Sequence, residues 1–138
     1  MTVASSGSVA AVGFQDVEDL LRTYFDGLYH SDVDRLAAVF HPAALYITQT
    51  PDGTLHRDLP TYLDVVAHRT APAARGETRN DRIVSITQVA KSLIVAVVEC
   101  SLGDVDYADV LTLLASDGRW QIVAKAFRAT PRRLDEKG

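Results

Sequence analysis

The stretch YADVLTLL at residues 107–114, followed by ASDGR at 115–119 and WQIVAKAF at 120–127, decides the fold of this chain. The first and last of these runs consist mainly of apolar residues typical of strands. An Asp-Gly pair between two such runs, here Asp117-Gly118, is among the strongest short-range signals for a β-hairpin. We therefore expect the chain to close its sheet with two antiparallel strands.

Upstream of this hairpin, the sequence predicts further strands. A short hairpin is expected where Ala44–Gln49 meets the turn residues Thr50–Gly53 and returns through Leu55–Arg57, since proline before Asp-Gly favours a turn. Two longer apolar runs then precede the closing hairpin and predict an antiparallel meander. Its strands are Arg82–Val89, Leu93–Leu102, Tyr107–Leu114 and Trp120–Ala129.

The N-terminal half predicts helices instead. From Gln15 to His30, apolar residues recur at the spacing of an amphipathic helix. A second helix is expected from a capping-box-like start at Ser31 to before Pro42, and a third from an N-cap at Asp58. The apolar residues of the first helix are Val17, Leu20, Leu21, Tyr24, Phe25 and Leu28.

Helices first and antiparallel strands afterwards indicate the α+β class. We expect a cone-shaped, curved antiparallel sheet of about six strands wrapped around three N-terminal helices. The single predicted domain covers residues 14–130, with a disordered leader at 1–13 and a flexible tail at 131–138. Because only 7% of the residues are aromatic, the wide end of such a cone is expected to hold a cavity.

Composition limits the classes of partner. The 138 residues are 47% hydrophobic and 23% charged, which is ordinary for a globular protein, and the net charge of −4 argues against nucleic acid. The longest apolar run, Leu93–Val98, is too short to span a bilayer, so no membrane partner is expected. Cys100 is the single cysteine and allows no intrachain disulfide, which predicts a cytoplasmic location.

Four stretches carry a resemblance to a known family. They are YFDGLYHSD at 24–32, LAAVFHPAA at 36–44, DGTL at 52–55 and the closing hairpin at 107–127. They are similar to the nuclear transport factor 2-like (NTF2-like) superfamily and, more narrowly, to its lumazine-binding-like branch. The resemblance implies a cystatin-like cone fold and a homodimer whose sheets pack on each other. It implies no single function, because the superfamily includes isomerases, dehydratases, cyclases and binding proteins.

Within that superfamily, the first helix and the strand after the second helix resemble ketosteroid isomerase. This resemblance implies Tyr24 as an oxyanion donor and places about Thr48 where that family has an aspartate base. The family's late aspartate falls at about Asp106, one residue before Tyr107. Because threonine cannot abstract a carbon-bound proton, we do not expect catalysis by that mechanism.

Asp109 is the most informative polar residue of the closing hairpin. It lies in a strongly apolar strand, and a buried carboxylate is costly unless it is paired. Lys125 is the expected partner, because a loop over 115–119 places residue 109 opposite about residue 125. The pair is either a structural salt bridge or part of a polar site, where Lys125 would hold an anionic ligand or form a Schiff base.

The four histidines, at positions 30, 41, 56 and 68, show no metal-ligand spacing. We therefore expect no metal and no cofactor. His56, on the short return strand, is the histidine best placed for a pocket. A His–Asp dyad of the dehydratase kind would need His56 or His68 beside a carboxylate.

These residues lead to two main functional hypotheses. The first is a protein that binds a small hydrophobic or heteroaromatic ligand. The second is a cofactor-independent acid–base enzyme, an isomerase, dehydratase, lyase or cyclase, that uses Asp109, Lys125, Tyr24 and His56. An adaptor with an exposed apolar patch is a third interpretation. The expected ligand-binding residues are Tyr24, Tyr46, Thr48, Tyr107, Trp120 and Phe127.

Overall fold

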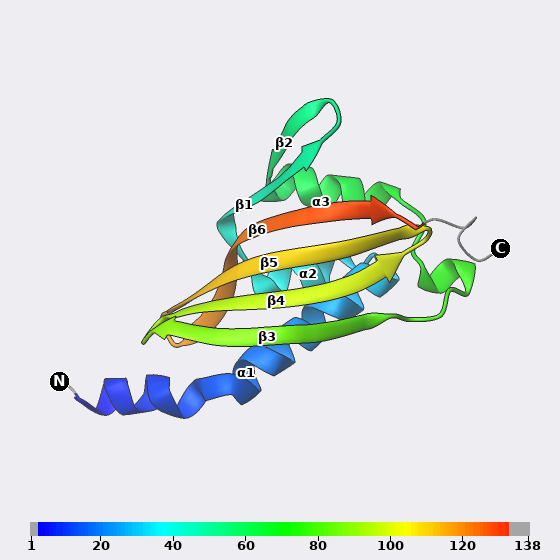
Figure 1. Cartoon of the computed structure of the whole chain (residues 1–138). Coiled ribbons are helices and arrows are strands. Elements are labelled where there is room, and N and C mark those ends of the chain that lie inside the picture. The colour runs from blue at the N-terminus through cyan, green and yellow to red at the C-terminus, as the bar shows by residue number, and fades with distance from the viewer. Residues whose placement is uncertain (1–2, 133–138) are drawn as a thin grey trace.

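The computed structural model describes the backbone of residues 3–132 and the side chains of residues 13–132. It consists of a curved six-stranded sheet with three α-helices packed against one of its faces (Figure 1). We call the face that meets the helices the inner face and the opposite one the outer face. This arrangement confirms the predicted α+β, cystatin-like architecture.

The helices begin and end close to the predicted residues. Helix α1 spans Val3–His30, α2 spans Val33–Val39, α3 spans Leu59–His68, and a short 3₁₀ helix η1 spans Ala73–Arg75. Asp58 caps α3 as predicted, by accepting a hydrogen bond from the Thr61 backbone N–H at 2.9 Å. The cap of α2 is Asp32 rather than the predicted Ser31, because Ser31 adopts a left-handed backbone conformation with φ 49°.

Helix α1 is interrupted at Gly13, where φ is 47° and ψ is −154°. Glycine reaches this conformation without the steric cost that a side chain would impose. The sequence predicted the boundary between leader and domain at this residue, and that boundary stays a prediction. The sequence predicted no regular structure before it, whereas helical turns continue back to Val3, in a segment that includes good helix formers such as Ala10 and Ala11.

The strands follow the order β2-β1-β6-β5-β4-β3 across the sheet. The expectation of a purely antiparallel sheet was wrong at one place, because β1 and β6 run parallel. Every other neighbouring pair is antiparallel. The strands are β1 Phe40–Thr50, β2 Gly53–Asp58, β3 Asp81–Ala90, β4 Leu93–Leu102, β5 Val105–Ser116 and β6 Arg119–Pro131.

The β5–β6 hairpin turns through two residues, since Ser116 pairs with Arg119. Asp117 and Gly118 have φ 52° and 79°, the positive values that a type I′ turn requires at both central positions. The register shifts between Thr112 and Leu113, so Asp109 lies opposite Phe127. The predicted pairing of residue 109 with about 125 was wrong by two positions. The two-residue turn, in place of the expected loop over 115–119, accounts for one position and the bulge after Thr112 for the other.

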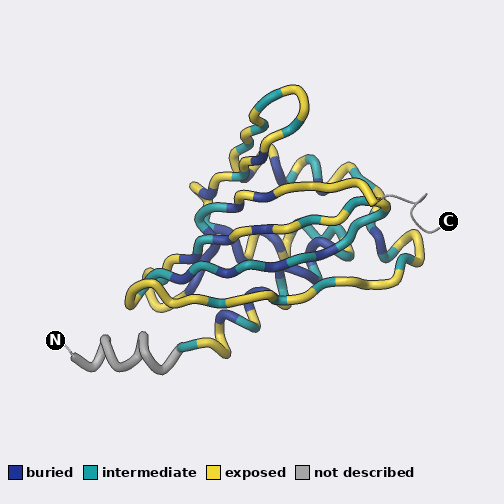
Figure 2. The backbone as a smooth tube through the Cα atoms, viewed as in Figure 1, coloured by how far each residue is buried: buried dark blue, intermediate teal, exposed yellow. Residues whose placement is uncertain are grey.

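The two faces of the sheet differ in burial. On the inner face, Val98 and Leu111 are buried completely, whereas Val110 on the outer face is 43% exposed. Figure 2 shows buried residues concentrated in the helices and the central strands, with the β1–β2 hairpin and the end of β6 largely exposed. In the part of the chain that the structure describes, no helix is long and apolar enough to cross a membrane.

Candidate functional site

The centre of the inner face carries a carboxylate that is almost completely buried. Asp109 is 1% exposed, and its Oδ2 accepts a hydrogen bond from the Tyr24 hydroxyl at 2.6 Å. Tyr24 lies on α1, in the apolar stripe that the sequence predicted, and its side chain has no exposure. The first helix and the fifth strand therefore meet through a polar contact inside an apolar core.

Lys125 lies beside this carboxylate. Its Nζ is 4.0 Å from Asp109 Oδ2, and the lysine side chain is 6% exposed. Because Asp109 lies opposite Phe127 in the sheet, the ion pair runs diagonally across the β5–β6 ladder. The ammonium group also donates a hydrogen bond of 3.4 Å to the hydroxyl of Tyr62 on α3.

Four aromatic rings surround the Lys125 ammonium group. The ring centroids lie between 5.0 and 5.3 Å from Nζ, within the range of a cation–π interaction. A desolvated ammonium gains more from such contacts than an exposed one, so the rings help to offset the cost of burying the charge. The rings belong to Tyr24, Tyr46, Tyr62 and Phe127.

The surroundings hold both titratable donors in their protonated forms. Burial, followed by the charge of Asp109, raises the pKa of Tyr24 well above its usual value. Burial opposes the charge of Lys125, but Tyr62 and Asp109 outweigh it and raise the pKa of the amine above its usual value. A Schiff base requires a neutral amine. This arrangement therefore favours an electrostatic role for Lys125 over a covalent one.

The buried pair leaves hydrogen-bonding capacity unused. Among the described residues, Asp109 Oδ1 has no hydrogen-bond partner although it is buried. The Lys125 ammonium has three N–H donors, and the 3.4 Å contact with Tyr62 is long for a hydrogen bond. The pair thus presents one acceptor and one donor inside an aromatic enclosure.

Two half-buried tyrosines lie at the edge of this enclosure. Tyr46 on β1 stacks on Tyr62 with a centroid distance of 4.6 Å. Tyr107 on β5 lies 6.0 Å from the ring of Phe127, and Phe127 lies 4.7 Å from Tyr46. We call Tyr46, Tyr107 and Phe127 the aromatic rim. Tyr46 and Tyr107 are partly exposed, so solvent reaches the enclosure at this rim.

Thr48, Trp120 and His56 lie apart from the pair. The hydroxyl of Thr48 donates to the backbone carbonyl of Phe127 and so bridges β1 and β6. Trp120 lies at the hairpin end of β6, in a hollow shared with Asp16 and Leu20 of α1. His56 is exposed and lies opposite Ile47, which is 39% exposed, whereas the neighbouring Tyr46 points inward. His56 therefore does not join the pair.

The structure also changes which aspartate corresponds to the late aspartate of the isomerase template. Asp106, the residue expected to match the late aspartate, is exposed on the outer face and bonds to Ser101 at 2.6 Å. Asp109, three residues on, is the carboxylate that meets Tyr24. Strand alternation explains the difference, since residues 106 and 109 point to opposite faces.

Helix α3 and the residue that follows it supply two side chains that the sequence analysis did not assign to the site. Tyr62 on α3 contacts Lys125, and Arg69, the extended C-cap residue after His68, acts electrostatically on Cys100. Tyr62 and Val66 are four residues apart, a spacing that predicts one shared helix face. What that signal does not predict is that the face covers Lys125.

Cys100 lies on the inner face of β4, opposite Tyr107. Burial, followed by the charge of Asp109, raises its pKa to about 12, with Lys125 and Arg69 acting in the opposite direction. At neutral pH it is therefore a protonated, weakly nucleophilic thiol. In the described part of the chain, no three His, Cys, Asp or Glu side chains converge as a metal site would require.

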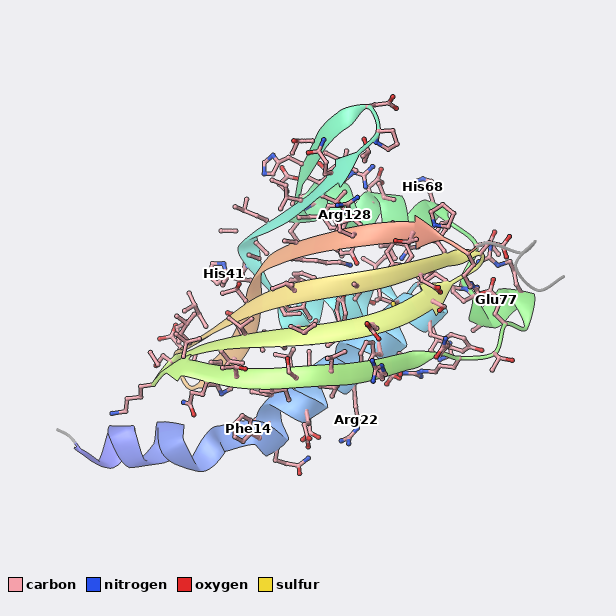
Figure 3. All side chains as sticks on the ribbon, in the orientation of Figure 1. Phe14, Arg22, His41, His68, Glu77 and Arg128 are labelled. Atoms are coloured by element: carbon pink, nitrogen blue, oxygen red, sulfur yellow. The ribbon has the colours of Figure 1, made fainter. Side chains whose placement is uncertain are left out.

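A polar hollow on the outer face has a volume of about 300 Å³. Arg82, Glu99, Asp106 and Arg128 contribute its charged lining. Figure 3 labels Arg128 on β6 beside this region. At the centre of the inner face, Lys125 lies among its four rings. The cavity that the sequence predicted at the wide end of the cone stays a prediction.

Solved structures share this fold. An NTF2-like protein of unknown function from Silicibacter pomeroyi DSS-3 is 21% identical, with a TM-score of 0.74 over 84% of this chain and 94% of that chain. One from Shewanella baltica OS155 is 18% identical, with a TM-score of 0.77 over 85% and 93%. A cystatin-like fold protein from Burkholderia xenovorans LB400 is 15% identical, with a TM-score of 0.64 over 92% and 95%. The fold is therefore NTF2-like.

The family follows from the sequence comparison. A family model described as "Putative lumazine-binding" matches residues 13–128, so the chain belongs to that family. The curated proteins contain no significant match to it.

Proposed function

We propose that this protein binds a small planar heteroaromatic ligand through a lactam-type edge, in which a ring N–H lies next to a carbonyl. The observation that carries the proposal is the buried pair itself. Asp109 Oδ1 is a free acceptor for the ring N–H, and the Lys125 ammonium is a donor for the carbonyl. A site built to hydrogen-bond both groups discriminates strongly against ligands that lack either.

The aromatic rim supports a planar ligand. Tyr46 and Tyr107 are half-buried and flank Phe127, so a flat ring inserted at the rim would lie against aromatic faces. The family description supports the same chemistry, because lumazine is a planar fused ring with adjacent N–H and carbonyl groups. Binding requires movement of rim side chains, since Lys125 and the rings now fill the enclosure.

Calorimetric titration with lumazine tests this proposal. We expect Lys125→Met to weaken binding at least about tenfold, because a charge-assisted hydrogen bond is lost. Lys91, exposed in the turn between β3 and β4, offers a matched control, and Lys91→Met should leave the affinity unchanged. Absence of binding to the wild-type protein, or equal affinity in Lys125→Met, would contradict the proposal.

Acid–base catalysis at the same place is the second candidate. The unpartnered Asp109 Oδ1 favours it, because a general base needs a free oxygen within reach of the substrate proton. Hydrogen–deuterium exchange into enolisable ketones, followed by NMR in D₂O, is the corresponding test. Exchange that is lost in Asp109→Asn would support an enzyme, and no exchange above the buffer rate would leave ligand binding as the function.

We propose further that two copies of the chain associate through their outer faces. Four apolar side chains form a continuous row across β1, β6, β5 and β4, as the strand registers give it. Val110 and Ile47 in this row are 43% and 39% exposed. Exposed apolar patches of this kind mark interaction surfaces. The row consists of Ile47, Ala126, Val110 and Val97.

Light scattering coupled to size exclusion tests the dimer. We expect the wild-type protein to have twice the chain mass of 15.0 kDa and Val110→Lys to have the chain mass. Phe14→Lys is the control, because Phe14 is 51% exposed but lies on α1, away from the outer face (Figure 3). A wild-type monomer, or a Val110→Lys dimer, would contradict this proposal.

We also propose that the protein acts in the cytoplasm. The single cysteine is a buried free thiol, which suits a reducing compartment. Fractionation of cells that express the tagged chain tests this location, and recovery with the membrane or secreted fraction would contradict it.

A further inference from the structure

Arg69 directly follows α3, the helix whose Tyr62 contacts the buried pair. It is the C-cap residue, with the extended backbone angles φ −99° and ψ 153°, and its backbone N–H donates to the Val66 carbonyl at 3.3 Å. Tyr62 and Val66 on the preceding helix are 2% and 0% exposed. Arg69 itself is partly buried.

The Arg69 guanidinium has unused donors. Its Nε is buried without a hydrogen-bond partner, and no carboxylate among residues 13–132 forms an ion pair with it. A buried donor that stays unpaired is costly and calls for an explanation such as an absent ligand. His68, the preceding residue, is exposed and bonds to Asp64 of its own helix, so it does not compete for the same position.

Arg69 brings a further charge close to the inner face. Among the described residues, the buried charged side chains are Asp109 and Lys125, which are opposite in sign. Arg69 is partly buried and has a buried Nε. It acts electrostatically on Cys100, the thiol that Asp109 and Lys125 also influence and that pairs with Tyr107 of the rim. An anionic group near the rim would therefore meet a second cation besides Lys125.

We propose that Arg69 binds a carboxylate substituent of the heteroaromatic ligand whose ring edge contacts Lys125 and Asp109. This inference rests on the proposed function and specifies the ligand class further. A carboxylate fits the planar guanidinium fork by accepting two parallel hydrogen bonds. The ligand would then span the inner face, with its polar ring edge at the buried pair and its anionic end at α3.

The test compares two probes that differ only in this group, lumazine and lumazine-6-carboxylate, by calorimetric titration. We expect the carboxylate to bind the wild-type protein at least about tenfold more tightly. Arg69→Gln should bring the two probes within about twofold of each other and leave lumazine itself unaffected. Arg69→Lys, which keeps the charge but loses the fork, should retain part of the difference and remains informative if Arg69→Gln folds poorly.

Arg22→Gln is the control for overall charge, since Arg22 is an exposed arginine of α1 that pairs with Asp19 at 3.4 Å. It should retain the full difference between the probes. Lumazine binding without a gain from the carboxylate, or a gain that survives in Arg69→Gln, would overturn the role of Arg69 alone. Failure of both probes to bind would overturn this inference together with the proposed function.

Discussion

The two faces of this sheet each carry an ion pair, and the surroundings of the two pairs differ greatly. On the outer face, Arg82 and Glu99 approach to 2.9 Å, with side chains 68% and 47% exposed. On the inner face, Lys125 and Asp109 are 4.0 Å apart, with side chains 6% and 1% exposed. Water screens the exposed pair although it is the shorter one, whereas removing one partner of the buried pair leaves an uncompensated charge. The burial of an ion pair, and not the distance between its charges, therefore decides how much stability is lost when one partner is removed.

The largest expected effect is the loss of the buried carboxylate. Asp109→Ala leaves the Lys125 ammonium without its partner and the Tyr24 hydroxyl without its acceptor. We expect the free energy of unfolding to fall by about 3–5 kcal/mol, measured by urea denaturation. The double variant Asp109→Leu with Lys125→Met removes both charges and should recover most of that loss. A change below about 1 kcal/mol in the single variant would show that the pair behaves like a surface pair.

A smaller effect is expected from the hydrogen bond that anchors the carboxylate. Tyr24→Phe removes the 2.6 Å bond to Asp109 but retains the ring that contacts Lys125. We expect a loss of about 1–3 kcal/mol, because a buried charged acceptor is left with fewer donors. Thermal and urea unfolding of this variant give the value. No loss would mean that Asp109 finds another donor in the folded state.

The pH dependence gives a third test of the inner face. Tyr24 and Lys125 both have raised pKa values in the folded state, so the folded chain keeps protons that the unfolded chain releases above about pH 10. Their contribution to stability is therefore complete below pH 10 and declines as the pH rises further. Above pH 10, Tyr24→Phe should flatten the decline by about 1.4 kcal/mol per pH unit. Parallel curves for the two proteins would contradict this prediction.

The smallest effect is expected on the outer face. Glu99→Ala removes the exposed partner of Arg82, and we expect less than about 1 kcal/mol of change in the free energy of unfolding. Urea denaturation in 0.1 M and 1 M salt completes the test, since salt screens exposed pairs more than buried ones. A loss as large as that of Asp109→Ala would remove the distinction between the two faces.

Much of the inner face could be predicted from local sequence. The spacing of apolar residues predicted α1 and with it the inward position of Tyr24. The cost of burying Asp109 in an apolar strand predicted that it has a partner, and counting across the expected loop selected Lys125. The two-residue turn and the bulge after Thr112 move Lys125 from the directly opposite position to a diagonal one, from which it still reaches the carboxylate.

The residues that were missed depend on contacts between distant elements. Nothing local indicates that Tyr62 on α3 contacts Lys125, because that contact depends on how the helix packs. His56 was assigned to a pocket, yet it faces outward, since a short strand does not determine which of its residues point in. The parallel pairing of β1 with β6 is likewise a property of the assembled sheet.

A crystal structure of the protein with bound lumazine tests the central claim most directly. The account predicts the ring against the aromatic rim, its N–H within hydrogen-bond distance of Asp109 Oδ1 and its carbonyl within that distance of Lys125 Nζ. Lumazine bound elsewhere, for example in the polar hollow of the outer face, with the Lys125–Asp109 pair unchanged, would contradict it.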